Sequence, residues 1–245
     1  LALVFLKANC PLFHAAALFR LFHLSKELRK NITSEDIQKM ASKVVAATLA
    51  IPIPPNRAEI DKLVDTEENI IESHQRNLAS LLGLSTNVPT RNSLINDLKR
   101  MGVLQHAFQP FQDLYKWLEV DFHPLVLCSR VQQVIDFILQ EKTKKECPDL
   151  EHYVSSLKDV TIMRLLKEVS QVYQTIEYKR LLELCPFANF TYLEKMVVEA
   201  ARRNDLQVRI DHRKGCLIFG TELRVSQGEE LIEGPHLQSM PSEQI

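Results

Sequence analysis

A helical repeat of apolar residues runs through most of this chain and restricts its fold more than any other feature. Within Asp159–Tyr173, for example, the apolar residues recur three and four positions apart, as they would on one buried face of an α-helix: Ile162, Leu165, Leu166, Val169 and Tyr173. Similar segments follow one another with short connections. Because each such helix buries only one face, neighbouring helices must pack together. The pattern therefore predicts a mainly α-helical solenoid of paired antiparallel helices.

Local signals mark where these helices begin and end. Thr33 precedes Glu35 and Asp36, the arrangement of a hydroxyl cap followed by acidic residues in the first turn. Thr90 is a second cap, and Gly83 is a C-terminal stop signal. The predicted helices span Leu12–Arg29, a segment from Thr33 that stops at Pro52, Glu67–Leu82, Arg91–Met101, Gln109–Leu118, Leu125–Gln140, Asp159–Tyr173, Ile176–Leu184 and Thr191–Arg203.

One segment, Asn204–Gly220, departs from this pattern. Strand-forming residues alternate up to Ile210, a turn follows, and Gly215 supplies the positive φ that a short loop tends to need. A helix, a short helix, another helix and a hairpin in succession are typical of a winged helix. Alternation should direct Leu206, Val208 and Ile210 towards the helix that precedes the hairpin.

We expect this hairpin to have two strands and to act as an assembly edge. A lone ribbon leaves backbone N–H and C=O groups unpaired along its outer edges, where a strand of a partner can be added. The alternative is a solvent-exposed wing that only covers the core. The candidate interface edge comprises Leu206, Gln207, Val208, Arg209, Ile210, Cys216, Leu217, Ile218 and Phe219.

The charge distribution gives no overall attraction to nucleic acid or membranes, because 30 basic residues balance 31 acidic ones. Acidic residues gather in Glu59–Ser73, which we expect to lie away from RNA. Cations gather instead at Arg202, Arg203, Arg209, Arg213 and Lys214. Two interpretations of these cations stay open: solvated tips, or a contact with mRNA, rRNA or an acidic ribosomal surface. Sequence-specific DNA reading is disfavoured, because Glu194 and Glu199 on the preceding helix would repel phosphates.

Catalytic and cofactor motifs are absent from the sequence, which contains no HExxH, GxSxG, GxxxxGK[ST] or GxGxxG pattern. We therefore expect no catalytic residue, no metal and no cofactor. The five cysteines are widely spaced without a CxxC, which indicates reduced thiols in the cytoplasm. One alternative is a hydrolase whose nucleophile is Cys128, near His123. We favour a buried, inert thiol.

Phe187 and Phe190 are expected to fill the core.

No apolar run approaches the ~20 residues of a membrane-spanning helix, so no membrane contact is expected. The sequence begins at Leu1 without a signal peptide, which indicates a piece of a longer protein.

Several long strings of residues resemble a known family. HAAALFRLFHLSKELRKN at His14–Asn31, LINDLKR at Leu94–Arg100, YKWLEV at Tyr115–Val120, LQVRIDH at Leu206–His212 and GPHLQSMPSEQI at Gly234–Ile245 are similar to the PCI domain of the largest subunit of eukaryotic translation initiation factor 3. The PCI family takes its name from the proteasome lid, the COP9 signalosome and the initiation factor. The similarity covers the whole chain.

This resemblance implies a non-catalytic, cytoplasmic scaffold with a right-handed helical solenoid that ends in a winged helix. The implied divisions are a helical-repeat part at 1–158, a winged-helix part at 159–220 and a C-terminal extension at 221–245. The implied partners are the other subunits of initiation factor 3, with subunit c bound through winged-helix contacts, and the small ribosomal subunit near the mRNA exit. The alternative is a PCI scaffold of the proteasome lid or the COP9 signalosome.

Overall fold

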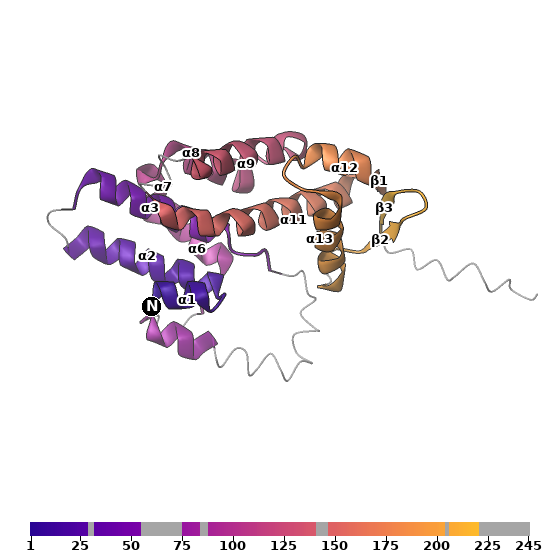
Figure 1. Ribbon diagram of the computed structural model, residues 1–245. Helices are drawn as coiled ribbons and strands as arrows, with labels where there is room; N and C mark the ends of the chain where they lie inside the picture. The colour runs from indigo at the N-terminus through magenta and orange to yellow at the C-terminus, as the bar shows by residue number, and fades with distance from the viewer. Residues whose placement is uncertain (29–31, 55–74, 84–87, 141–146, 204–205, 221–245) are drawn as a thin grey trace, which may run out of the picture.

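The computed structural model describes residues 1–28, 32–54, 75–83, 88–140, 147–203 and 206–220. Most of these residues are helical, and a small sheet lies at one end of the molecule (Figure 1). The helices are α1 Ala2–Lys7, α2 Pro11–Leu28, α3 Ser34–Leu49, α6 Arg91–Arg100, α7 Val103–His106, α8 Gln109–Glu119, α9 Pro124–Leu139, the 3-10 helix η1 Pro148–Tyr153, α11 Val154–Val172, α12 Tyr178–Leu184 and α13 Phe190–Arg202. A further helical segment occupies 75–81. The strands are β1 Thr175–Glu177, β2 Val208–Asp211 and β3 Cys216–Phe219.

The predicted caps form as expected from the sequence. The Thr33 side chain accepts a hydrogen bond of 3.2 Å from the backbone N–H of Asp36 at the start of α3. Thr90 and Ser93 form a reciprocal capping box at the start of α6. Three short elements, α1, α7 and η1, were not predicted, because none is long enough to show a helical repeat. The predicted helix Glu67–Leu82 is described only from residue 75, and Glu59–Ser73 lies outside the described residues.

Helix α11 is shared by two hydrophobic cores. Leu157, in its first turn, belongs to a core built with α1, α2, α3, α6, α8 and α9. Ile162, Leu165 and Leu166 belong to a second core with α12, α13 and the sheet. In Figure 1, α11 runs from the stacked helices into the group of short elements at the other end. α11, α12, α13 and the sheet thus form the winged-helix arrangement that the sequence predicts.

The sheet has three antiparallel strands in the order β1-β3-β2. Leu217 of β3 lies opposite Ile176 of β1 on one side and Ile210 of β2 on the other. The expected hairpin forms from β2 and β3, but it is not a lone two-stranded ribbon, because β1 pairs with the other side of β3. The prediction of a helix that starts at Ile176 is wrong, because α12 starts at Tyr178. The strand Thr175–Glu177 shows an exposed-buried-exposed pattern that is too short to stand out in a sequence. It forms because β3 offers a second edge for pairing.

No helix in the described ranges is long and apolar enough to span a membrane.

Candidate functional site

Strand β2 alternates between the core and solvent, as the sequence predicts. Leu206, which precedes the strand, is buried, and Val208 and Ile210 pack against the second core. Gln207 and Arg209 are exposed on the opposite face. The sheet thus gains from packing on the helices, which a small isolated ribbon could not do.

The two outer strands leave backbone groups that point away from the sheet. The N–H of Gly220 donates to the C=O of Gln207 at 3.2 Å, so Gln207 bonds towards β3. Antiparallel strands alternate inward and outward bonding, which directs the backbone groups of Val208 and Ile210 to the outer edge of β2. β3 is the central strand, paired on both sides. Its residues therefore form no edge, contrary to the prediction for Cys216, Leu217, Ile218 and Phe219.

The turn between β2 and β3 is held by its own first residue. The Asp211 carboxylate accepts hydrogen bonds from the backbone N–H groups of Lys214 at 3.1 Å and Arg213 at 3.0 Å, and these bonds lower its pKa. Gly215 has φ +62, where a side chain would strain the backbone. The Gly215 carbonyl also accepts a 2.9 Å bond from the N–H of Tyr178, which ties the turn to α12. The exposed side chains of Arg213 and Lys214 thus project from an ordered turn.

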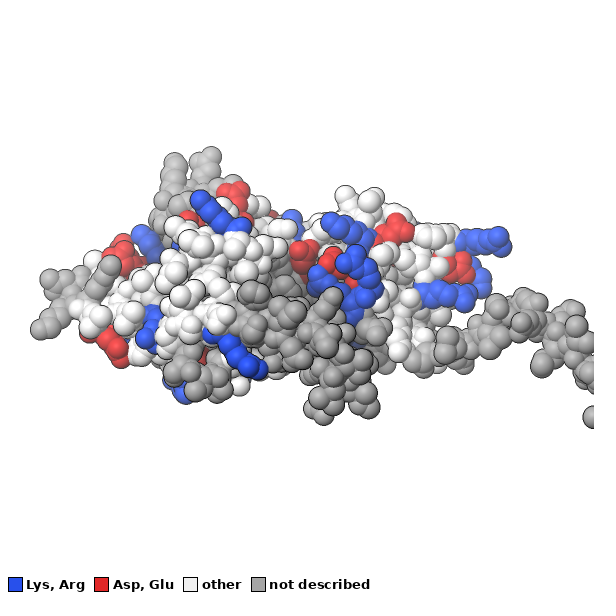
Figure 2. Space-filling view, turned by 90° about the horizontal axis from the view of Figure 1, so that it is seen from below, with Lys and Arg blue, Asp and Glu red and all other residues white. Residues whose placement is uncertain are grey.

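The five predicted cations do not form one patch. Arg202 and Arg203 lie at the C-terminal end of α13, and Arg203 is paired with Glu199. The turn lies nearer the other end of α13, because His212 Nε2 is 3.5 Å from Glu194 Oε1. Figure 2 shows basic side chains in two separate groups over this end of the molecule, with acidic side chains beside each. Any phosphate contact by these cations would thus involve two separate sites.

The outer face of α13 carries mixed charge and one exposed aliphatic residue, Val198. Glu194 and Glu199 lie on this helix beside the cations and are engaged by His212 and Arg203. That this helix does not read DNA stays a prediction.

Phe190, the first residue of α13, and Phe187, which precedes this helix, differ in burial. Phe190 is 44% exposed, and its ring lies 4.9 Å from the Tyr178 ring between centroids, so its expected place in the core is wrong. Phe187 is half-buried and packs against the second core.

The alternative catalytic residue is inaccessible. Cys128 has no exposed surface, and its Sγ lies 3.5 Å from the Sγ of buried Cys185. This hydrogen bond and the burial raise the pKa of Cys128, so the reactive thiolate is strongly disfavoured. His123 is exposed at the start of α9, whereas both thiols are buried. In the part of the chain that the structure describes, no group of three His, Cys, Asp or Glu residues could hold a metal ion.

Comparison with known proteins agrees with this architecture. A family model described as "eIF3a, PCI domain, TPR-like region" matches residues 1–126, and a model described as "PCI domain" matches residues 130–221. The chain belongs to the eIF3a PCI-domain family.

Curated relatives of this PCI domain are named as the A subunit of eukaryotic translation initiation factor 3. The chain is 54% identical over 245 residues to that of Drosophila grimshawi and covers 27% of the relative's length. It is 53% identical to that of Drosophila willistoni and 52% identical to that of Drosophila mojavensis, and it covers 21% of each. In all three comparisons the whole chain is matched. The chain thus spans about a quarter of the length of these relatives.

Sequence reasoning missed one part of the PCI domain that could be functional. Strand β1 lies on the other side of β3 from the predicted edge, beside an apolar groove. Exposed Val172 and Tyr173 line this groove, although the helical stripe placed Tyr173 in the core. The sequence contains one weak signal for this strand, the polar-apolar-polar alternation at Thr175–Glu177. A segment of this length can be recognised as a strand only once its pairing with β3 is known.

Proposed function

We propose that this chain is a non-catalytic scaffold segment of eukaryotic translation initiation factor 3 and acts in the cytoplasm during translation initiation. Its membership of the eIF3a PCI-domain family is the observation that carries the proposal. The names of its relatives favour initiation factor 3 over the proteasome lid and the COP9 signalosome. In this proposal the chain pairs with other subunits of that factor, above all subunit c, through its winged helix.

We further propose that the scaffold places the factor on the small ribosomal subunit near the mRNA exit, with the turn at Arg213 and Lys214 facing RNA. The two cations project from a turn that Asp211 and Gly215 hold in shape. Phosphate contacts from such a turn would add affinity without selecting a sequence.

The proposed units are a helical-repeat part at 1–158, a winged-helix part at 159–220 and an extension at 221–245. The two hydrophobic cores support a division inside α11, since Leu157 packs in the first and Ile162 in the second. The extension lies outside the described residues.

Proline at position 208 should block assembly while the chain stays folded. Val208→Pro removes an N–H that points away from β3 and replaces one small apolar side chain by another, so the ladder with β3 is kept. A partner strand would lose one hydrogen bond and would meet the proline ring. We expect recovery of co-expressed subunit c in an affinity pull-down to fall roughly tenfold.

The matched control for this edge is Arg209→Pro, one residue along. The Arg209 N–H points towards Ile218 in β3, so this proline should break the sheet itself and lower the melting temperature. If the Val208→Pro chain keeps its circular dichroism and recovers as much subunit c as the unmodified chain does, the outer edge of β2 is not the interface with subunit c.

Neutralising the turn should weaken RNA binding in a salt-dependent manner. For Arg213→Ala with Lys214→Ala, we expect the slope of log affinity against log salt concentration to fall by about 0.7 for each phosphate that the turn no longer neutralises. Fluorescence anisotropy with a labelled single-stranded oligouridine, over a series of potassium chloride concentrations, measures this slope. Lys7→Ala with Lys116→Ala is the control, because both side chains are exposed and lie on α1 and α8. If the slope of log affinity against log salt concentration is equal in the two double variants, the turn is solvated and makes no contact with RNA.

A further inference from the structure

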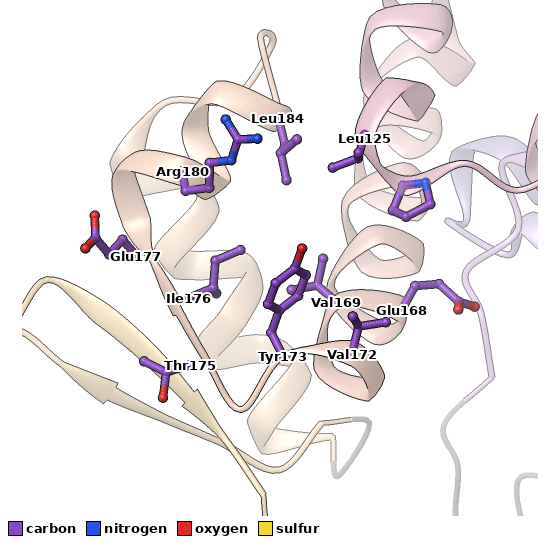
Figure 3. A pocket seen from close by; sticks show the side chains of 11 residues that line it. Leu125, Glu168, Val169, Val172, Tyr173, Thr175, Ile176, Glu177, Arg180 and Leu184 are labelled. Atoms are coloured by element: carbon purple, nitrogen blue, oxygen red, sulfur yellow. The ribbon is translucent and has the colours of Figure 1, made fainter.

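An apolar groove of about 540 Å³ lies on the open side of β1. The start of α9, the end of α11, strand β1 and helix α12 enclose it. Figure 3 shows the Tyr173 ring directed into the space between α11 and α12, with Leu184 and Leu125 across from it and Ile176 beside it. The groove therefore joins the solenoid helices to the winged-helix sheet.

The walls of this groove expose an unusual amount of apolar surface. Leu125 is 61% exposed, Val172 is 73% exposed and Tyr173 is 48% exposed. All three line the groove. Buried Val169 and Ile176 form its inner surface. Apolar side chains that converge on one hollow indicate a docking site more strongly than scattered exposed ones do.

Strand β1 adds backbone groups that an extended segment could satisfy. The C=O of Gln174 accepts a bond from Phe219 N–H at 2.8 Å, and Tyr178 N–H donates to Gly215. Gln174 and Tyr178 therefore bond across to the β3 side of the sheet. By antiparallel alternation, the backbone groups of Thr175 and the N–H of Glu177 point away from β3. A segment that pairs there would place every second side chain next to Ile176.

Charge at the groove specifies the kind of segment that fits. Glu168 and Glu177 lie on opposite rims, as Figure 3 shows. Arg180 is the cation of the lining and is already paired with Glu183 at 2.8 Å. Within the described ranges, no ion pair or side-chain hydrogen bond engages Glu168 or Glu177. The rims therefore favour cations, and they would repel the phosphates of RNA.

We propose that this groove binds an extended segment of a partner protein that adds a fourth strand to β1. An apolar side chain of the segment enters the hollow beside Ile176 and Tyr173. Lysine or arginine residues on either side of it face Glu177 and Glu168. The proposal goes beyond the scaffold function, because it concerns the edge of the sheet opposite to β2.

The extension of this chain does not match that chemistry. Residues 221–245 contain five acidic residues and a single cation, Arg224. Glu168 and Glu177 would repel such a segment. A second copy of the groove carries the same two carboxylates and is disfavoured for the same reason. The charge of the rims thus favours a basic segment of a different protein over these two occupants.

A short fluorescein-labelled peptide in which leucine alternates with lysine is a direct probe. Fluorescence anisotropy at low salt should show that this lysine peptide binds the chain. The matched peptide, in which leucine alternates with glutamate, should not bind. Glu168→Lys with Glu177→Lys should weaken binding of the lysine peptide about fivefold, as expected for two surface ion pairs, one with exposed Glu177 and one with half-buried Glu168. Equal binding of the two peptides, or no effect of the charge reversal, would overturn the proposal.

Proline variants separate this edge from the edge of β2. Thr175→Pro removes an outward N–H from an exposed position, so it should abolish peptide binding and leave recovery of subunit c unchanged. Val208→Pro should leave peptide binding unchanged whether or not β2 is the joint with subunit c. A Thr175→Pro chain that keeps its circular dichroism and still binds the peptide would show that β1 is not the docking strand.

Photocrosslinking identifies the occupant in the assembled factor. A benzoylphenylalanine at position 173, inside the groove, should crosslink to a protein segment with lysine or arginine next to its apolar residue. The same residue at position 190, which is exposed and does not line the groove, is the control. Crosslinks from position 173 to residues 221–245, to a second copy or to RNA would each contradict the proposal.

Discussion

Replacing Glu119 with leucine should destabilise the protein by about 3–5 kcal/mol, because it leaves a buried guanidinium without its anionic partner. The side chain of Arg91 is 6% exposed and that of Glu119 is 13% exposed, with Nη2 and Oε1 2.6 Å apart. The Nε–H of Arg91 also donates to the C=O of Ile51 at 3.2 Å. The pair thus holds together the start of α6, the end of α8 and the chain after α3. Urea unfolding monitored by circular dichroism measures the loss.

A double variant isolates the cause of this loss. With Arg91→Met and Glu119→Leu together, both charges are removed and an apolar contact takes their place, so most of the lost stability should return. If the double variant is as unstable as Glu119→Leu alone, the hydrogen bond to Ile51 and the packing of the Arg91 side chain matter more than the unpaired charge. A loss below about 1 kcal/mol in the single variant would show that water reaches the pair.

Proline at position 217 should unfold the winged helix and leave the solenoid helices folded. Leu217 has no exposed surface and belongs to the central strand, opposite both Ile176 and Ile210. Leu217→Pro empties a core site and breaks the ladder, which together should cost about 4 kcal/mol or more. Hydrogen exchange measured by mass spectrometry should lose protection in β1, β2, β3 and α13. Amides in α3 and α8 should stay protected, because they belong to the other core.

Leu217→Ala is the companion variant, because it removes the buried side chain and keeps the backbone N–H. It should cost about 2–3 kcal/mol and leave the sheet paired. Loss of protection in α3 and α8 of the Leu217→Pro chain would mean that the two cores unfold as one unit. The proposed division inside α11 would then not separate two parts that unfold independently.

Local patterns in the sequence determined most of the helices and the two strands of the hairpin, β2 and β3. A cap such as Thr33 acts on a backbone N–H three residues away, so its signal is contained within one turn. A helical stripe or a strand alternation needs only the next few residues, which is why β2 and the C-terminal end of α11 were predicted close to their observed positions. The start of α11 was missed, since the helix begins at Val154 and not at Asp159. Family resemblance in long strings of residues then indicated the PCI domain, which the family models confirm.

Contacts between distant segments decided the rest. Strand β1 exists because Ile176 meets Leu217, and nothing in so short a segment specifies a partner that lies far along the chain. That pairing places β3 in the centre, moves the open edges to β1 and β2, and creates the groove beside Tyr173. The cations at Arg202 and Arg213 are near in sequence, yet they lie towards opposite ends of α13. A helix is a rigid spacer of about 1.5 Å per residue, so the length of α13 separates them.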